Sequence, residues 1–186
     1  NEAFLWTSEG GMVGIGDLPG ANFHSIANAV SADSSTVVGR SNSSLGAEAF
    51  RWTASGGMVG LGALPGGSGS IAQAVSGAGA LVVGGADLGF FLGQGAFIWD
   101  ETNGMRNLQT VLTNEFGLDL TGWTLKEARS VSDDGRTIVG YGLNPIGNPE
   151  AFVAVVPEPS SIVLIAIAFG MVGVKVAFRS QKFTFY

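Results

Sequence analysis

Three near copies of one segment follow one another through the first 142 residues, and this repetition restricts the possible folds more than any other feature. The pattern Ala-Phe-x-Trp starts at Ala3, Ala49 and Ala96, at offsets of 46 and 47 residues, and a partial fourth copy starts at Ala151. Repeats of this length are typical of solenoids and propellers. The units are unit 1 (1–46), unit 2 (47–94) and unit 3 (95–155, including the start of the fourth copy).

Each unit is predicted to form four short strands. In unit 1 we expect them at 2–7, 12–16, 25–31 and 36–40, separated by segments rich in Gly, Pro, Asp and Ser. The 30 glycines of the chain are accounted for by these turns. Four strands in 46–47 residues match one blade of a β-propeller. The expected fold is therefore all-β, with the units as propeller blades, three plus a partial fourth, which is an incomplete set.

Unit 3 carries an insertion at 107–127 that the other units lack. Leu108, Val111 and Leu112 fall on one face at helical spacing, and Gly117 follows as a C-cap. The insertion therefore predicts a short helix that covers the end of the repeat array.

The C-terminal segment differs from the rest of the chain in charge and hydropathy. The first 158 residues contain all 15 acidic residues and six basic ones, whereas the last 28 contain three basic residues and no acid. Residues 162–178 are almost wholly apolar and would span about 25 Å as a helix. We expect a short transmembrane helix rather than a buried core helix, because residues 162–174 contain no polar stripe.

The basic residues of this segment predict its orientation. Lys175, Arg179 and Lys182 form the basic stop of the anchor, with a basic tail at 179–186. Positive residues favour the cytoplasmic side of a membrane, so the acidic repeat body is expected outside the cytoplasm.

A short proline motif precedes the apolar segment. Val156, Pro157, Glu158 and Pro159 open the motif region 156–161, and the two prolines favour an extended, accessible backbone. The motif, the span and the basic end together resemble the bacterial PEP-CTERM sorting signal at 156–186. This resemblance implies anchoring in the inner membrane, followed by processing by exosortase, a membrane-embedded cysteine transpeptidase. The basic residues are scattered here instead of forming the family's tight Arg cluster.

The repeat text resembles the HAF repeats of extracellular bacterial proteins. The Ala-Phe-x-Trp, Gly-Met and Ala-x-x-Val-Ser elements are present, but Glu2, Glu48 and Gly95 replace the His that names the family. HAF repeats commonly precede a PEP-CTERM tail, so the two resemblances agree. They imply a body at the cell surface or in the extracellular matrix after processing. We also expect the chain to be the C-terminal part of a longer secreted protein; the alternative is a short mature form that assembles with partners or as an open array.

Few residues have the types that catalysis requires. The chain has no Cys, and His24 is its single His, so Cys-based and His-cluster metal sites are excluded. No nucleophile-elbow or dinucleotide motif occurs, and no cofactor is predicted. The net charge of −6 argues against nucleic-acid binding. Trp123, as a candidate exposed aromatic in the insertion, and His24, in a loop, remain candidate binding residues.

Two functional hypotheses follow. The first is a non-catalytic bacterial surface or matrix repeat protein, with exosortase as a transient partner of its tail and extracellular polysaccharide as a candidate ligand. The second is an extracellular polysaccharide-acting enzyme whose propeller active site lies partly in upstream blades; this rests on fold analogy alone.

Overall fold

The computed structural model describes residues 1–89 and 93–156, and in these the chain consists of strands and turns with one short helix. The expectation of an all-β fold is confirmed. The helix α1 (Leu108–Asn114) lies inside the 107–127 insertion. The strands are β1 (Phe4–Thr7), β2 (Gly11–Gly14), β3 (Ser25–Val30), β4 (Thr36–Ser43), β5 (Gly46–Thr53), β6 (Gly57–Gly60), β7 (Ser70–Val75), β8 (Leu81–Asp87), β9 (Gln94–Asp100), β10 (Gly104–Asn107), β11 (Thr124–Val131), β12 (Thr137–Leu143) and β13 (Pro149–Val155).

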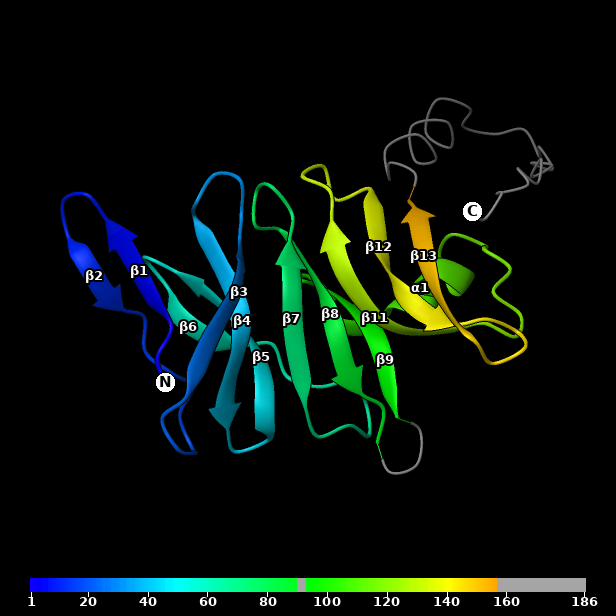
Figure 1. Ribbon diagram of the computed structural model, residues 1–186, viewed down its shortest axis with the longest axis horizontal. Helices are drawn as coiled ribbons and strands as arrows, with labels where there is room; N and C mark the ends of the chain where they lie inside the picture. Colours follow the sequence, from blue (N-terminus) through cyan, green and yellow to red (C-terminus); the bar gives the residue numbers. More distant parts are fainter. Residues whose placement is uncertain (90–92, 157–186) are drawn as a thin grey trace, which may run out of the picture.

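The strands form four small antiparallel sheets in the described residues. Sheet I contains β1 and β2, sheet II β3 to β6, sheet III β7 to β10, and sheet IV β11 to β13, and each strand pairs with its neighbours in the sequence. The sheets follow one another along the long axis of the molecule in chain order (Figure 1). The first strands of sheets II, III and IV lie side by side, because β7 contacts both β3 and β11.

The boundaries between sheets fall inside the sequence units, which corrects the expectation that one unit forms one sheet. In unit 1, β1 and β2 belong to sheet I, whereas β3 and β4 belong to sheet II. The connection lengths explain the offset. Only Ser44 and Leu45 separate β4 from β5, so these strands form a tight hairpin across the boundary between units. The longer segment 15–24 instead passes from one sheet to the next.

A β-bulge recurs at the same place in the first strand of sheets II, III and IV. The extra residues are Asn28, Gln73 and Arg129. A bulge redirects a side chain, and two of these side chains bridge to the next sheet. Asn28 Nδ2 donates to Ala72 O at 2.8 Å, and Gln73 Nε2 donates to Glu127 Oε1 at 2.5 Å. Arg129 forms an ion pair with the buried Glu127 within sheet IV.

Apolar side chains fill the three spaces between successive sheets, which we call junction 1 (sheets I and II), junction 2 (II and III) and junction 3 (III and IV). Phe50 is fully buried in junction 1, Phe97 in junction 2, and Phe152 is almost fully buried in junction 3. These residues are equivalent in the repeat. Junction 3 is the largest, because the apolar face of α1 adds Leu108, Val111 and Leu112 to it.

Junctions 1 and 2 are closed by the same hydrogen bonds. In junction 2 the buried Ser70 hydroxyl accepts from Ala49 N–H at 2.9 Å and donates to the Gly62 carbonyl. Glu48 Oε1 accepts from Gly62 N–H at 3.0 Å. Ser25 and Glu2 make the equivalent bonds in junction 1, to the residues Ala3 and Gly16. Each junction thus pairs backbone groups that the crossing segment would otherwise leave unsatisfied.

Junction 3 lacks these bonds because its residues differ. Gly95 stands in place of Glu48 and Asn107 in place of Gly60, and in the sheet register Leu125 lies where Ser70 does. The changes at positions 48 and 60 depend on each other, because the two residues compete for the same space. A Cβ at Gly60 would lie 2.2 Å from Glu48 Oε1, whereas one at Gly95 would lie 3.1 Å from Asn107 Nδ2.

The predicted membrane span at 162–178 lies outside the described residues. Within residues 1–89 and 93–156, no helix has the length and apolar character needed to cross a membrane.

Candidate functional site

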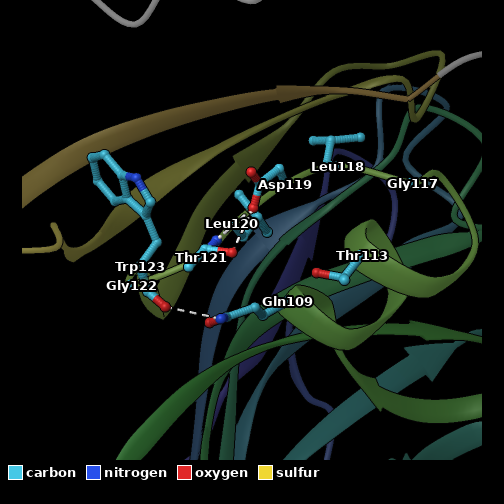
Figure 2. Close-up of a pocket in the computed structure, with 9 residues that line it drawn as sticks. All are labelled: Gln109, Thr113, Gly117, Leu118, Asp119, Leu120, Thr121, Gly122 and Trp123. Carbon is cyan, nitrogen blue, oxygen red and sulfur yellow. Dashed lines mark hydrogen bonds between the residues drawn. The ribbon is translucent and has the colours of Figure 1, made fainter. Parts of the chain in front are cut away.

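An open cavity of about 460 Å³ lies at junction 3, between α1 and the segment that leads to β11 (Figure 2). Both walls come from the insertion that only unit 3 carries, so units 1 and 2 have no counterpart. Its lining combines hydroxyl, amide, carboxylate and apolar groups. The lining residues are Gln109, Thr113, Gly117, Leu118, Asp119, Leu120, Thr121, Gly122 and Trp123.

The helix forms one wall and is fixed at its start by its own sequence. Asn107 is the N-cap, and its side chain accepts from Thr110 N–H at 3.0 Å. The buried face of Leu108, Val111 and Leu112 holds the helix against the sheets, which leaves Gln109 and Thr113 facing the cavity.

Gln109 connects the two walls. Its Nε2 donates to Trp123 O at 2.9 Å (Figure 2). Its Oε1 accepts from Leu125 N–H at 3.0 Å. This one side chain therefore ties the helix to the start of β11. In junction 3 the side chain of Gln109 thus accepts a hydrogen bond from a backbone N–H, as the side chain of Ser70 does in junction 2.

The opposite wall is a loop shaped by a turn around Asp119. Asp119 Oδ1 accepts from the Thr121 hydroxyl at 2.6 Å and from Thr121 N–H at 3.0 Å. These hydrogen bonds, the hydroxyl first, hold the pKa of the Asp119 carboxyl below its ordinary value. Asp119 is therefore a carboxylate at neutral pH and can accept further hydrogen bonds from a ligand.

Trp123 stands at the end of this loop. Its indole lies at one side of the cavity, while its backbone carbonyl faces Gln109 (Figure 2). The ring is partly buried against the core of junction 3. A partly exposed indole offers an apolar face for stacking beside the polar groups of the cavity.

A small ion-pair group holds the far end of α1. Arg106 contacts Asp100 at 2.9 Å and Glu115 at 2.6 Å, which links the β9–β10 hairpin to the end of the helix. Burial acts to raise the pKa of Asp100, but hydrogen bonds from Asn103 and the charge and hydrogen bond of Arg106 outweigh it. The pKa of Asp100 therefore lies below its ordinary value.

The structure does not bring the two candidate binding residues together. Trp123 lines the cavity at junction 3, whereas His24 lies in the loop before β3, which is separated from β11 by β7. The sorting residues Pro157, Glu158 and Pro159 and the basic residues Lys175, Arg179 and Lys182 lie outside the described residues. Val156 is described: it is buried, and its N–H donates to Arg136 O at 2.7 Å.

Sequence reasoning identified the insertion and Trp123 but not Gln109, Asp119 or Thr121. The insertion length was the available signal, since it marks the part of the repeat that departs from the pattern. Among the described residues, no group of three or more His, Asp or Glu side chains is arranged to hold a metal ion.

Comparisons with known proteins give little information. No protein-family model and no curated protein matches the sequence. Among solved structures, the chain is similar to TolB from Acinetobacter baumannii, at 14% identity and a TM-score of 0.45. The match covers 74% of this chain and 33% of the TolB chain, so the chain spans about a third of the length of that structure.

Proposed function

We propose that this chain is a non-catalytic bacterial repeat protein of the cell surface or extracellular matrix, which binds a sugar chain at junction 3. The observation that carries the binding proposal is the cavity that unit 3 alone builds, with an indole beside hydroxyl, amide and carboxylate groups. Sugars present apolar ring faces and many hydroxyls, and they match this combination of stacking and hydrogen-bonding groups.

The cavity geometry is consistent with binding along a chain. It is open and lies between a helix and a loop, so an extended polymer can enter and leave it without threading. Asp119 is ionised and can accept sugar hydroxyls, while Gln109 keeps the two walls at a fixed separation. We therefore assign extracellular polysaccharide as the ligand class.

A glycan-array screen of the full chain in detergent or lipid nanodiscs tests this proposal. We expect binding to at least one polysaccharide, weakened about tenfold, or ~1.4 kcal/mol, by either Trp123→Ala or Thr121→Val. Thr121→Val keeps the side-chain shape and removes the hydroxyl that orients Asp119. The control is Trp6→Ala, which removes an exposed indole far from the cavity. Binding that survives both cavity variants, or no binding to any glycan, contradicts the proposal.

We also propose that sheets II and III are consecutive four-stranded blades of a β-propeller, and that sheet IV is a blade with three of its strands described. Two features support this. The strands of each sheet are connected in simple antiparallel order, and the first strands β3, β7 and β11 lie side by side, as innermost strands do around a propeller axis.

The last part of the proposal concerns sorting. Residues 156–186 would hold the protein in the inner membrane until exosortase processes it near Pro157–Pro159; this rests on the resemblance of the tail. Mass analysis of the protein from bacteria with and without an exosortase tests it. We expect removal of the tail only where the enzyme is present, and a full-length product from the variant Glu158→Ala. An intact tail in the mature surface fraction contradicts this part alone.

A further inference from the structure

Sheet I is half of a sheet, and its apolar side chains are uncovered. Phe4 is 55% exposed, whereas its equivalents Phe50, Phe97 and Phe152 are 0%, 0% and 4% exposed. Trp6 and Met12 on the same hairpin are also strongly exposed, while their counterparts in unit 2 are half-buried. The same side chains in the same repeat are therefore covered everywhere except in unit 1. The β1–β2 hairpin alone would not be expected to leave such a group of residues in water.

The first strand of sheet II, β3, also exposes apolar side chains that are buried in the equivalent strands of sheets III and IV. Val30 is 56% exposed, whereas the equivalent Val75 and Val131 are each 8% exposed. Ala27 is exposed, but its equivalent Ala72 is fully buried in junction 2. In junction 2 the residues that cover this position come from β3, β4 and β5 of the preceding sheet. Val38 of β4 is one of them. Sheet I has no counterpart of β3 or β4 in the described residues.

A third observation is the unpaired edge of β1. Its equivalents β5 and β9 each pair with two strands, whereas β1 pairs only with β2 in the described residues. An unpaired edge leaves a row of backbone N–H and C=O groups open to another strand. The free edge of β1 and the uncovered face of β3 are thus the two surfaces that a counterpart of β3 and β4 would occupy.

We propose that this combined surface, made by β1, β2 and β3, is the docking site for a further unit of the same repeat. Such a unit supplies one strand that pairs with β1 and a second strand that pairs with the first, and these two cover Ala27 and Val30. Its other two strands cover Phe4 and Trp6. The proposal concerns an interaction surface and does not depend on ligand binding at junction 3.

Register favours this occupant. The Ala-Phe-x-Trp segments of units 1 and 2 start 46 residues apart, so a unit of 46 residues joined directly ahead of Asn1 would place its last strand next to β1 as β4 lies next to β5. Unit 1 already shows that such a unit suffices, because the sheet I hairpin and the segment after it bury Phe50 completely. The edge of β13 that has no partner strand in the described residues fits less well as an occupant from a second molecule. Phe152 and Phe4 are equivalent, so that contact would pair two strands that occupy the same position in their sheets.

A tandem duplication tests the proposal in the full chain. A second copy of residues 1–46 is fused directly ahead of Asn1, which gives Phe4, Trp6 and Val30 the surroundings of Phe50, Trp52 and Val75. We expect amide hydrogen exchange in residues 4–7 and 25–30 to slow at least about tenfold relative to the original chain. We also expect the Trp fluorescence of the duplicated protein to shift to shorter wavelength. Neither change should appear if the added copy fails to cover Trp6 and the edge of β1.

The matched control carries the substitution Val38→Asp in the added copy only, because this position faces the next sheet. It should abolish most of the protection of residues 25–30, whereas Val13→Asp in the added copy should not, because the equivalent Val59 stays 56% exposed beside a covered sheet. Unchanged exchange in the duplicated protein overturns the proposal. Protection of the same residues in the original chain, together with a dimer in sedimentation, would assign the surface to a second copy instead. A loss of glycan binding would leave all these outcomes unaffected.

Discussion

Junctions 2 and 3 solve the same structural problem in different ways. Each must provide hydrogen-bond partners for the backbone N–H and C=O groups of the segment that passes from one sheet to the next. Junction 2 does so with the carboxylate of Glu48 and the hydroxyl of Ser70 over a short, glycine-lined crossing. Junction 3 uses a helix, and Gln109 reaches from it to the start of β11. The helical crossing leaves an open cavity.

The difference shows that the junction residues change as a group. Glu48 needs Gly60, because any Cβ at position 60 would meet its carboxylate. Where Gly95 removes the carboxylate, Asn107 can take the glycine's place and cap α1. A site in the array therefore requires replacing the whole set of junction bonds, since a single substitution would leave a group buried without a partner.

The largest expected effect comes from removing the buried hydroxyl of junction 2. Ser70→Ala leaves Ala49 N–H and Gly62 C=O without their side-chain partner. We expect the free energy of unfolding to fall by about 2 kcal/mol, the usual cost of a buried unsatisfied group. Urea denaturation measures it. The control is Lys126, which aligns with Ser70 in the sequence but is the extra residue of a bulge in β11: Lys126→Ala should change stability by less than about 0.5 kcal/mol. Equal losses would mean that the junctions do not differ as described.

A smaller effect tests the coupling between Glu48 and Gly60. Gly60→Asn should displace the Glu48 carboxylate and break its hydrogen bond to Gly62 N–H, at a cost of about 1.5 kcal/mol. Glu48→Gly removes the same bond. The double variant should therefore be more stable than the sum of the two losses predicts, by at least about 0.5 kcal/mol. Additive losses in urea denaturation would show that the two positions are independent.

Much of the fold could be predicted from the repeat, and the part that could not has a clear physical reason. Strand positions follow from local alternation and turn residues, so the expected 25–31 is close to the observed β3. The grouping of strands into sheets depends on which connection is a tight hairpin. A repeated sequence has no preferred starting point, so the unit boundaries placed after residues 46 and 94 do not coincide with the boundaries between sheets.

The candidate site was predictable only in location. The 107–127 insertion and Trp123 stand out because they depart from the repeat pattern. Gln109 looks like any exposed helical residue in the sequence, and its two bonds to the β11 segment exist only after the helix packs. The exposure of Phe4 was equally invisible, because the text of unit 1 matches that of unit 2, and only the neighbouring strands differ.

The smallest expected effect separates the junctions by pH. Asp100 has a lowered pKa in the folded state, so its contribution to stability is fully present above its unfolded pKa of about 3.9 and is lost as pH falls through the lower folded value. Because Asp100 holds Arg106, and Arg106 holds the end of α1 through Glu115, this loss should weaken junction 3 first.

The variant Asp100→Asn isolates this effect, because it removes the charge of residue 100 at every pH. Near neutral pH it should be less stable than the original chain by under about 1 kcal/mol, because an ion pair that is still partly exposed to water contributes little. Below the folded pKa of Asp100 the two proteins should have the same stability, since the original carboxyl is then also uncharged. Hydrogen exchange should assign the neutral-pH difference to α1 and the β9–β10 hairpin, with Ala49 in junction 2 unchanged. A difference that persists at low pH would mean that Asp100 acts through shape or hydrogen bonding, and junction 3 would then resemble junction 2 in depending on geometry more than on charge.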